Sequence, residues 1–410
     1  MTKLSLTNTY QRYPEYKDSG VKWVGQIPAD WDVATSRRLF RTKKTLASET
    51  DSQKLLSLTL QGVKPRIQDG SGKNPANYDT YQEFKKDNLV FCLFDYDVTP
   101  RTIGYVSEDG MMTGAYTRLI PKEEADSKFY YYYFLSLDYS KELLHLCTGL
   151  RNGISKPVFW SMKNPLPPKP EQEKIARFLD KETERIDTIM AKKQRLIELL
   201  KEKRTATINH AVTKGLDPNA ELVDSGVDWI GKIPKVWEVK KIKFVSRLNY
   251  GESLASELRE NGEVPVYGSN GEVGKHSVAN TKAPVLFVGR KGSFGAIKFS
   301  RQEAFAIDTV YYIDQTCTKQ HLRWLFYVLS AANLGDVSQD TGVPGLSRDA
   351  AYKKIVPVPT ASQQRQIADE LDLLVSKYEM AINTVQNSIT LLQELKSSLI
   401  SHAVTGKIKV

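Results

Sequence analysis

The chain of 410 residues contains two related copies of one sequence unit. The segment DSGVKWVGQIPADWDV starts at Asp18, and a similar segment, DSGVDWIGKIPKVWEV, starts at Asp224, 206 residues later. A second pair, PLPPKPEQEKIARFLD from Pro165 and PVPTASQQRQIADELD from Pro357, is 192 residues apart. Each copy therefore has a similar head and a similar tail, with a more divergent stretch between them. A long internal repeat of this kind predicts two structural units of related architecture.

The tail of each copy has the apolar spacing of a long helix. Steps of four and three residues give a first seam of Ile175, Leu179, Glu182, Ile186, Ile189, Lys193, Leu196 and Leu200. A similar seam runs from Ile367 to Leu399, and this 3.5-residue repeat is typical of coiled coils. A helix from Pro170 to His210 would be about 60 Å long at 1.5 Å per residue. We therefore expect a paired helical rod that acts as a spacer.

The connection between the copies predicts the direction of this pairing. Only the short segment LDPNAEL links Gly215 to Val223, so the second head begins where the first helix ends. The second helix emerges from that same copy and must run back to lie against the first. We expect an antiparallel coiled coil with a pseudo-twofold axis across it.

Between head and tail, each copy has short β-rich runs separated by Gly- and Asn-rich turns. The runs are NLVFCLF, AYTRLI, PVLFVG and DTVYYI, and each copy continues into a short helical segment, FYYYYFLSL or LRWLFYVLS. This pattern is typical of α+β globules. We predict four segments: a globular domain at 1–165, a long helix at 166–215, a second globular domain at 216–357 and a second long helix at 358–410.

Composition narrows the possible partners and the cellular location. The formal net charge of +10 is weak support for a polyanionic partner. No run of 18 apolar residues exists and the first 20 residues are polar, which argues against a membrane span and a signal peptide. The three cysteines are scattered, without the spacing of a disulfide framework or a zinc site. We expect a cytoplasmic protein.

The repeated motifs, taken together, resemble the specificity subunit of a Type I restriction–modification system. The resemblance rests on the DSGV heads, the Pro-rich segments before the long helices, and AVTKG or AVTGK after them. It implies two target-recognition domains, each reading one half of a bipartite DNA sequence, and helices that fix the gap. It also implies docking of two methyltransferase subunits and, through them, restriction/translocase subunits. S-adenosylmethionine, ATP and Mg²⁺ would then belong to those partners, and this chain would bind no cofactor.

Candidate DNA-binding residues lie in basic loops that also contain Gly, Asn and Ser. Arg and Lys contact phosphates and guanine, and Asn pairs with adenine, which is why these types are favoured. The candidates of the first globule are Lys64, Arg66, Lys73, Asn74, Arg101, Arg151 and Asn152. Those of the second are Ser269, Asn270, Lys275, His276, Arg290, Lys291, Ser293 and Arg348. The head tryptophans recur in both copies, so we expect them to be structural.

Enzyme signatures are incomplete. GSNGEVGKHS resembles a phosphate-binding loop but has Ser269 and His276 where that motif needs Gly and Ser or Thr. A nuclease-like pattern of Asp228, Glu238 and Lys240 is not repeated in the first copy. We therefore expect no catalytic residues and no metal ligands. Two alternatives stay open: a DNA-binding protein without methyltransferase partners, and an enzyme in its own right.

Overall fold

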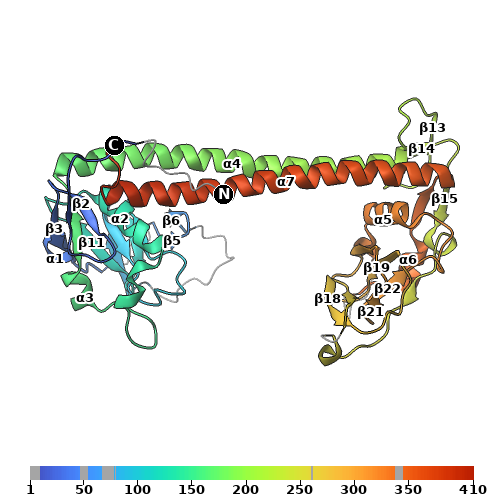
Figure 1. Ribbon diagram of the computed structural model, residues 1–410, viewed down its shortest axis with the longest axis horizontal. Coiled ribbons are helices and arrows are strands. Elements are labelled where there is room, and N and C mark those ends of the chain that lie inside the picture. Colours follow the sequence, from blue (N-terminus) through green and yellow to red (C-terminus); the bar gives the residue numbers. More distant parts are fainter. Residues whose placement is uncertain (1–9, 47–53, 67–77, 79, 260–261, 338–344) are drawn as a thin grey trace. The chain divides into compact units, whose positions relative to one another are not determined.

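The computed structural model describes residues 10–46, 54–66, 78, 80–259, 262–337 and 345–410. The chain forms two compact units: unit 1 contains Met1–Lys193 and Asn387–Val410, and unit 2 contains Gln194–Gln386. Two long helices, α4 (Lys169–Lys214) and α7 (Ala361–Val404), are each divided between the units (Figure 1). Each unit therefore combines one globule with part of both helices.

The globule of unit 1 is built on a four-stranded antiparallel sheet in the order β4-β11-β8-β9. Its strands are β4 (Phe40–Arg41), β8 (Leu89–Phe91), β9 (Ile103–Tyr105) and β11 (Thr117–Pro121). Helix α2 (Ser127–Tyr139) packs on this sheet, and its Tyr130 and Phe134 rings contact Phe40 edge-on or tilted. The run NLVFCLF contains β8, the run AYTRLI contains all of β11 except Pro121, and FYYYYFLSL lies in α2, as predicted.

Smaller elements join the head of this copy to its tail. Strand β3 (Asp32–Thr35) pairs with β12 (Lys163–Leu166), which leads directly into α4. The other two-stranded pairs are β1 (Tyr16–Asp18) with β2 (Gln26–Pro28), β5 (Leu56–Thr59) with β6 (Gly62–Pro65), and β7 (Tyr81–Phe84) with β10 (Gly110–Thr113). Short helices α1 (Ser36–Leu39), η2 (Glu142–Leu146) and α3 (Lys156–Ser161) complete the described elements.

Unit 2 repeats this plan. Its antiparallel sheet has the order β16-β22-β19-β20, with α5 (Leu322–Ala331) packed in the same core. The strands are β16 (Asn249–Tyr250), β19 (Val285–Gly289), β20 (Ile297–Ser300) and β22 (Val310–Ile313). The head pair is β13 (Leu222–Asp224) with β14 (Lys232–Pro234), and β15 (Glu238–Lys241) pairs with β23 (Ile355–Val358). The short helices are η3 (Ile242–Phe244), η4 (Ser256–Leu258), η5 (Leu334–Val337) and α6 (Arg348–Lys353). The units differ most in a three-stranded sheet of unit 2, formed by β17 (Val264–Gly268), β18 (Gly271–His276) and β21 (Phe305–Ala306).

An equivalent buried glutamine in each copy attaches the start of the long helix to the globule. The side-chain oxygen of Gln172 accepts a hydrogen bond from the backbone N–H of Asp126, the N-cap of α2, at 2.8 Å. Its amide nitrogen donates to the carbonyls of Glu124 and Pro167, both at 2.9 Å. These bonds explain why a glutamine lies in the first turn of each long helix, directly after a Pro-rich segment.

Gln364, 192 residues later, makes the same kind of contact in unit 2. It accepts from the backbone N–H of His321, the N-cap of α5, at 2.9 Å, and donates to the Pro359 carbonyl at 2.9 Å. Its amide also donates to the side chain of Gln320 at 2.6 Å. The repeat offset seen in the sequence is therefore kept at the level of single hydrogen bonds.

The long helices run antiparallel within the units. In unit 2, Arg204 of α4 faces Glu379 of α7 at 3.6 Å, and the Thr207 and Tyr378 hydroxyls are 3.3 Å apart. In unit 1, Asp187 in the first half of α4 pairs with Lys396 in the last part of α7 at 2.7 Å. Residue numbers rise along one helix as they fall along the other. The predicted antiparallel pairing is confirmed.

The predicted seam is wrong at one position of α4. Ile175, Leu179 and Ile186 are buried, but Leu196 is 44% exposed and Ile197, the next residue, is 2% exposed. An apolar stripe on a straight helix follows its 3.6-residue turn, and the spacing from Ile186 to Ile197 is close to three full turns. The contact stripe therefore shifts to Ile197 where a strict heptad would require Leu196.

The last turn of each long helix packs against the head of the other copy. Val212 near the end of α4 lies in one core with Trp237 of the second head. Val404 at the end of α7 lies in one core with Trp31 of the first head. Both tryptophans are at most 5% exposed, which fits the structural role that their repetition predicts.

The buried glutamine provides a stability prediction. We expect Gln172→Ala to lower the free energy of unfolding by about 2–3 kcal/mol, because it leaves buried backbone groups of Asp126, Glu124 and Pro167 without partners. Urea unfolding followed by circular dichroism measures this decrease. Gln194→Ala, at an exposed position of the same helix, is the matched control and should change stability little. Equal effects of the two substitutions would contradict this role of Gln172.

Candidate nucleic-acid interface

Six predicted residues of the second globule come together at one end of its central sheet. The turn between β17 and β18 contributes Ser269 and Asn270, the loop after β19 contributes Arg290, Lys291 and Ser293, and Arg348 begins α6. The Ser293 hydroxyl donates to the side-chain oxygen of Asn270, which joins the first two loops. The backbone N–H of Leu346 donates to the Arg290 carbonyl at 2.8 Å, which joins the loop after β19 to the start of α6. We call these six residues, together with Tyr250, the unit 2 cluster.

Tyr250 is the member of this cluster that sequence reasoning missed. The guanidinium carbons of Arg290 and Arg348 lie 5.1 Å and 4.9 Å from the centroid of its ring, within the range of cation–π contacts. The Tyr250 residue is itself 47% exposed. The exposed Tyr250 ring therefore contacts two guanidinium groups at the protein surface. The signal in the sequence was an aromatic residue in NYGES, a short polar stretch with the Gly-containing character of the other loops.

The cluster is supported from beneath by Tyr311 of β22. Its ring lies 5.0 Å from that of Tyr250, and its hydroxyl donates to the Leu346 carbonyl at 3.0 Å. Burial, with the neighbouring Tyr250, raises the pKa of Tyr311 to about 12. The hydroxyl therefore stays protonated near neutral pH and keeps donating this hydrogen bond.

The positive charges of the cluster are only partly neutralised by the protein. Arg290 donates to the backbone carbonyl of Asp308 at 3.1 Å, and the Lys291 ammonium lies 3.8 Å from the Asp308 carboxylate. The side chains of Lys291 and Asp308 are 51% and 44% exposed, and exposed ion pairs contribute little free energy. A phosphate group can therefore replace the Asp308 carboxylate as the partner of Lys291 at little cost in free energy.

Two other predicted residues of unit 2 lie outside the cluster. Lys275 and His276 are at the end of β18 that is far from the turn at Asn270. The Lys275 ammonium pairs with Glu263 at 3.2 Å. The His276 Nδ1 lies 3.0 Å from the Leu258 carbonyl, and its ring packs edge-on against Phe305. The contacts of His276 are those of a structural residue.

In unit 1 the candidate loop that contains Arg151 and Asn152 is paired with acidic side chains of the same unit. Arg151 makes two hydrogen bonds to the Asp95 carboxylate and lies over the Phe94 ring at 4.9 Å. These hydrogen bonds lower the pKa of Asp95 below its usual value. The Asn152 amide donates to Asp97 at 2.7 Å. The Arg151 side chain is still 69% exposed, so it stays accessible to a ligand.

The remaining candidates of unit 1 have different surroundings. The Arg101 side chain is 12% exposed, pairs with the buried Asp138 carboxylate at 3.2 Å and lies over the Tyr139 ring, so its contacts are internal. Lys64 is exposed on β6. The backbone N–H of Arg66 donates to the Leu55 carbonyl at 2.7 Å. Lys73 and Asn74 lie outside the described residues.

A second basic feature recurs in both units and was not among the predicted residues. Arg37 and Arg41 follow β3 in unit 1, and Lys243 and Arg247 occupy the positions 206 residues later in unit 2. All four are exposed. In unit 2, Lys243 and Arg247 line a pocket of about 550 Å³ together with Lys319. The sequence signal for these residues was the recurrence of basic side chains at positions 206 residues apart.

Comparison with known families identifies this arrangement. Residues 28–199 and 234–391 each match the family model described as the Type I restriction modification DNA specificity domain. The chain belongs to this family. Each match begins in the head of one copy and ends within its long helix, so the internal repeat is a repeat of the specificity domain.

Similar proteins carry the same description. The Type I restriction enzyme MjaVIII specificity subunit of Methanocaldococcus jannaschii is 23% identical over 431 residues, covering 96% of this chain and 97% of that protein. The Type I restriction enzyme EcoprrI specificity subunit of Escherichia coli is 22% identical over 280 residues, covering 67% of this chain and 65% of that protein. The chain is accordingly a DNA specificity subunit of a Type I restriction–modification system, which is not catalytic by itself.

Solved structures show the same fold. A chain described under the structural basis of complex assembly and conformational transition of the type I R-M system has a TM-score of 0.73 at 13% identity, covering 92% of this chain and 98% of that one. The HsdS subunit from Thermoanaerobacter tengcongensis has a TM-score of 0.54 at 14% identity, covering 93% of this chain and 98% of that one. The predicted α+β fold with two recognition domains and an antiparallel helix pair is confirmed.

The described part of the specificity subunit contains neither a group of side chains suited to a metal ion nor a helix suited to cross a membrane. No group of three or more His, Cys, Asp or Glu side chains there is placed to hold a metal ion. Among the helices that the structure describes, none has the length and apolar character needed to span a membrane.

The unit 2 cluster provides a DNA-binding prediction. We expect Arg290→Ala with Lys291→Ala to weaken binding of the target duplex and to reduce the slope of log K against log salt by about 1 for each phosphate that the variant no longer binds. Fluorescence anisotropy at a series of salt concentrations measures both quantities. Lys275→Ala is the matched control, because it removes an exposed lysine of the same unit outside the cluster. An unchanged slope in the double variant would place the DNA-binding surface elsewhere.

Proposed function

We propose that this specificity subunit reads a bipartite DNA target with one unit per half-site. Its long helices would set the gap between the half-sites and bind two methyltransferase subunits, and through them restriction/translocase subunits. The observation that carries this proposal is the repetition of one framework with different loops. Two equivalent frameworks position two recognition surfaces, and different loops allow the half-sites to differ in sequence.

The chemistry of the unit 2 cluster supports base and phosphate recognition. Arg290 and Arg348 present guanidinium groups that can bond the two acceptors of guanine, and Asn270 presents an amide of the kind that pairs with adenine. Lys291 is a point charge suited to phosphate. Arg37 and Arg41, with Lys243 and Arg247, provide exposed positive charge at equivalent places in both units, as expected for contacts to the backbone, which is the same in both half-sites.

The long helices have exposed apolar side chains that support a docking role. On α4, Leu196 and Leu199 are 44% and 45% exposed, and on α7, Leu373 and Met380 are 51% and 59% exposed. Residues three or seven apart lie on the same side of a helix, so each pair forms a small apolar surface. Apolar surface of this kind is typical of protein–protein contacts.

The chemistry of modification and cleavage is assigned to the partners in this proposal. The methyltransferase subunits would bind S-adenosylmethionine and methylate adenines in the target. The restriction subunits would use ATP and Mg²⁺. The specificity subunit contributes the choice of sequence and the geometry of the assembly.

Co-expression with a methyltransferase subunit tests the docking role. We expect a complex of two methyltransferase subunits per specificity subunit, measured by light scattering after size exclusion. Leu196→Glu with Leu199→Glu should reduce this stoichiometry, because it places two charges in an apolar contact. Leu258→Glu, at a 50% exposed position on η4, is the control and should leave the complex intact. Failure of the unmodified chain to form the complex would favour a DNA-binding protein that acts without these partners.

Insertions in the helices test the role as a spacer. Seven residues added after Glu198 of α4 and seven after Thr384 of α7 should lengthen the preferred gap between half-sites. Each insertion adds about 10 Å of helix, close to the rise of about three base pairs. Methylation-sensitive sequencing of host DNA gives the gap directly. An insertion in α4 alone is the control, because it breaks the pairing of Arg204 with Glu379 and should impair assembly. An unchanged gap in an assembled double insertion would contradict this role.

A further inference from the structure

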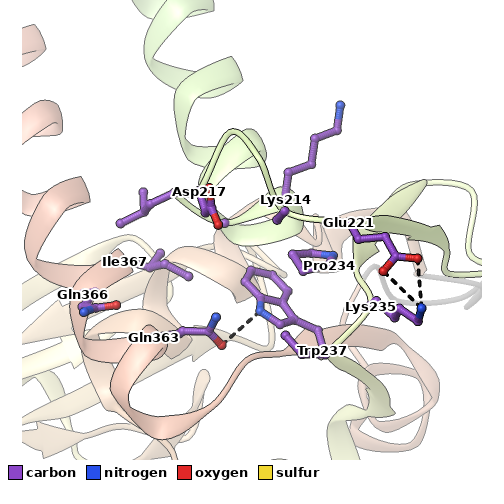
Figure 2. Close-up of a pocket in the computed structure, with 13 residues that line it drawn as sticks. Lys214, Asp217, Glu221, Pro234, Lys235, Trp237, Gln363, Gln366 and Ile367 are labelled. Atoms are coloured by element: carbon purple, nitrogen blue, oxygen red, sulfur yellow. Dashed lines mark hydrogen bonds and ion pairs between the residues drawn. The ribbon is translucent and has the colours of Figure 1, made fainter.

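Unit 2 has a pocket with apolar, amide and charged lining residues where α4 ends and α7 begins. Its volume is about 520 Å³, and its lining includes Leu216, Pro234, Trp237, Gln363, Gln366 and Ile367. Figure 2 shows the Trp237 indole between the linker after α4 and the first turns of α7. The indole nitrogen donates to the Gln363 side-chain oxygen at 3.2 Å. The pocket thus has an aromatic wall and amide groups, and its lining also includes the charged residues Lys214, Asp217, Glu221 and Lys235.

The equivalent place in unit 1 is filled by a tyrosine of this chain. The repeat offsets place Trp31 at the position of Trp237 and Glu171 at that of Gln363. The Tyr13 ring packs edge-on against Trp31 at 5.9 Å, and its hydroxyl donates to Glu171. Tyr13 is only 6% exposed. A buried tyrosine therefore occupies in unit 1 what is a pocket in unit 2.

The surroundings of Trp31 and Trp237 differ because the chain connects the head and the helix end differently in the two units. In unit 1 two separate segments meet there: Gln11 forms a β-bridge with Lys409, and the Lys409 ammonium lies over the Tyr13 ring. In unit 2 a single linker connects α4 to the second head. The linker residue at the position of Tyr13 is Asn219, which is exposed and whose backbone N–H bonds to the Asp217 side chain. The linker has no aromatic residue to place against Trp237.

The rim of the unit 2 pocket has more exposed apolar surface than the framework requires. Leu216 is 45% exposed and Val236 is 72% exposed. The position of Val236 is taken in the first head by Asp30, a charged residue suited to solvent. Exposed apolar side chains beside a pocket with an aromatic wall are typical of a surface that a partner covers.

We propose that this pocket binds a tyrosine side chain carried by an extended segment of a partner protein, as unit 1 binds its own Tyr13. Trp237 provides the edge-on aromatic contact, and the amides of Gln363 and Gln366 provide hydrogen-bonding groups for the hydroxyl. A second copy of this chain is a poorer occupant. Its own segment is held in place by the Gln11–Lys409 bridge and by the pairing of β1 with β2. This inference goes beyond the proposed function, because it does not require DNA recognition.

A peptide with the sequence TYQRYPEYKD, which contains Tyr13, is the probe for this pocket. We expect the fluorescein-labelled peptide to bind the full chain saturably, measured by fluorescence anisotropy. The same peptide with Tyr13→Ala should bind at least about tenfold more weakly, a difference of about 1.4 kcal/mol. Absence of binding at about 1 mM chain would overturn the proposal.

Variants of the chain locate the binding. Gln366→Trp fills the pocket from an exposed position of α7 and should weaken peptide binding at least about tenfold. Glu370→Trp, one turn further along the same exposed surface, is the matched control and should bind as the unmodified chain does. If Gln366→Trp fails to fold by circular dichroism, Leu216→Glu at the rim replaces it. Equal binding by pocket variant and control would overturn the proposal.

The oligomeric state of the chain provides a further test. Dimerisation that rises with chain concentration and is reversed by the peptide would also overturn the proposal, because the occupant would then be a second copy of the chain.

Discussion

The packing of each long helix against the head of the other copy is the constraint on which the rest of the structure depends. Val212 and Trp237 share one core, and Val404 and Trp31 share another. Each helix therefore starts in the globule of its own copy and ends on the head of the other. Neither copy is a complete structural unit by itself. This exchange explains why the compact units divide both helices and do not follow the order of the repeats along the chain.

The same framework supports different loop chemistry in the two units. The backbone N–H of Ile154 donates to the Leu93 carbonyl at 2.7 Å in unit 1, and that of Leu346 donates to the Arg290 carbonyl at 2.8 Å in unit 2. The two bonds are equivalent, since Ile154 and Leu346 are 192 residues apart. Unit 1 adds an Arg151–Asp95 pair beside this bond, whereas unit 2 adds two arginines around Tyr250. The candidate surfaces of the two units therefore differ in the side chains on these loops and in the β17–β18 turn of the three-stranded sheet in unit 2.

Most of the framework could be predicted from the sequence because it depends on repetition and periodicity. The offsets of the repeats, the two long helices, their direction and the main strands all follow from local patterns and connectivity. The error at Leu196 has the same origin, since a strict heptad ignores the shift of a stripe on a 3.6-residue helix. The DNA-binding candidates stay predictions, and their grouping depends on contacts between distant residues. Nothing in the local sequence places Tyr250 between Arg290 and Arg348, or Arg101 against Asp138.

The two head–tail junctions show how equivalent sequences acquire different roles. In unit 1 the junction is held by non-covalent contacts: Tyr13 covers Trp31, the Tyr16 hydroxyl donates to the Gly406 carbonyl at 3.1 Å, and Gln11 pairs with Lys409. In unit 2 a peptide linker makes the connection, so these contacts are not needed to hold the parts together. The parts of this junction therefore stay together although the linker has no aromatic residue. The framework around Trp237 is retained because α4 still packs there, and it leaves the pocket beside that ring open to another molecule.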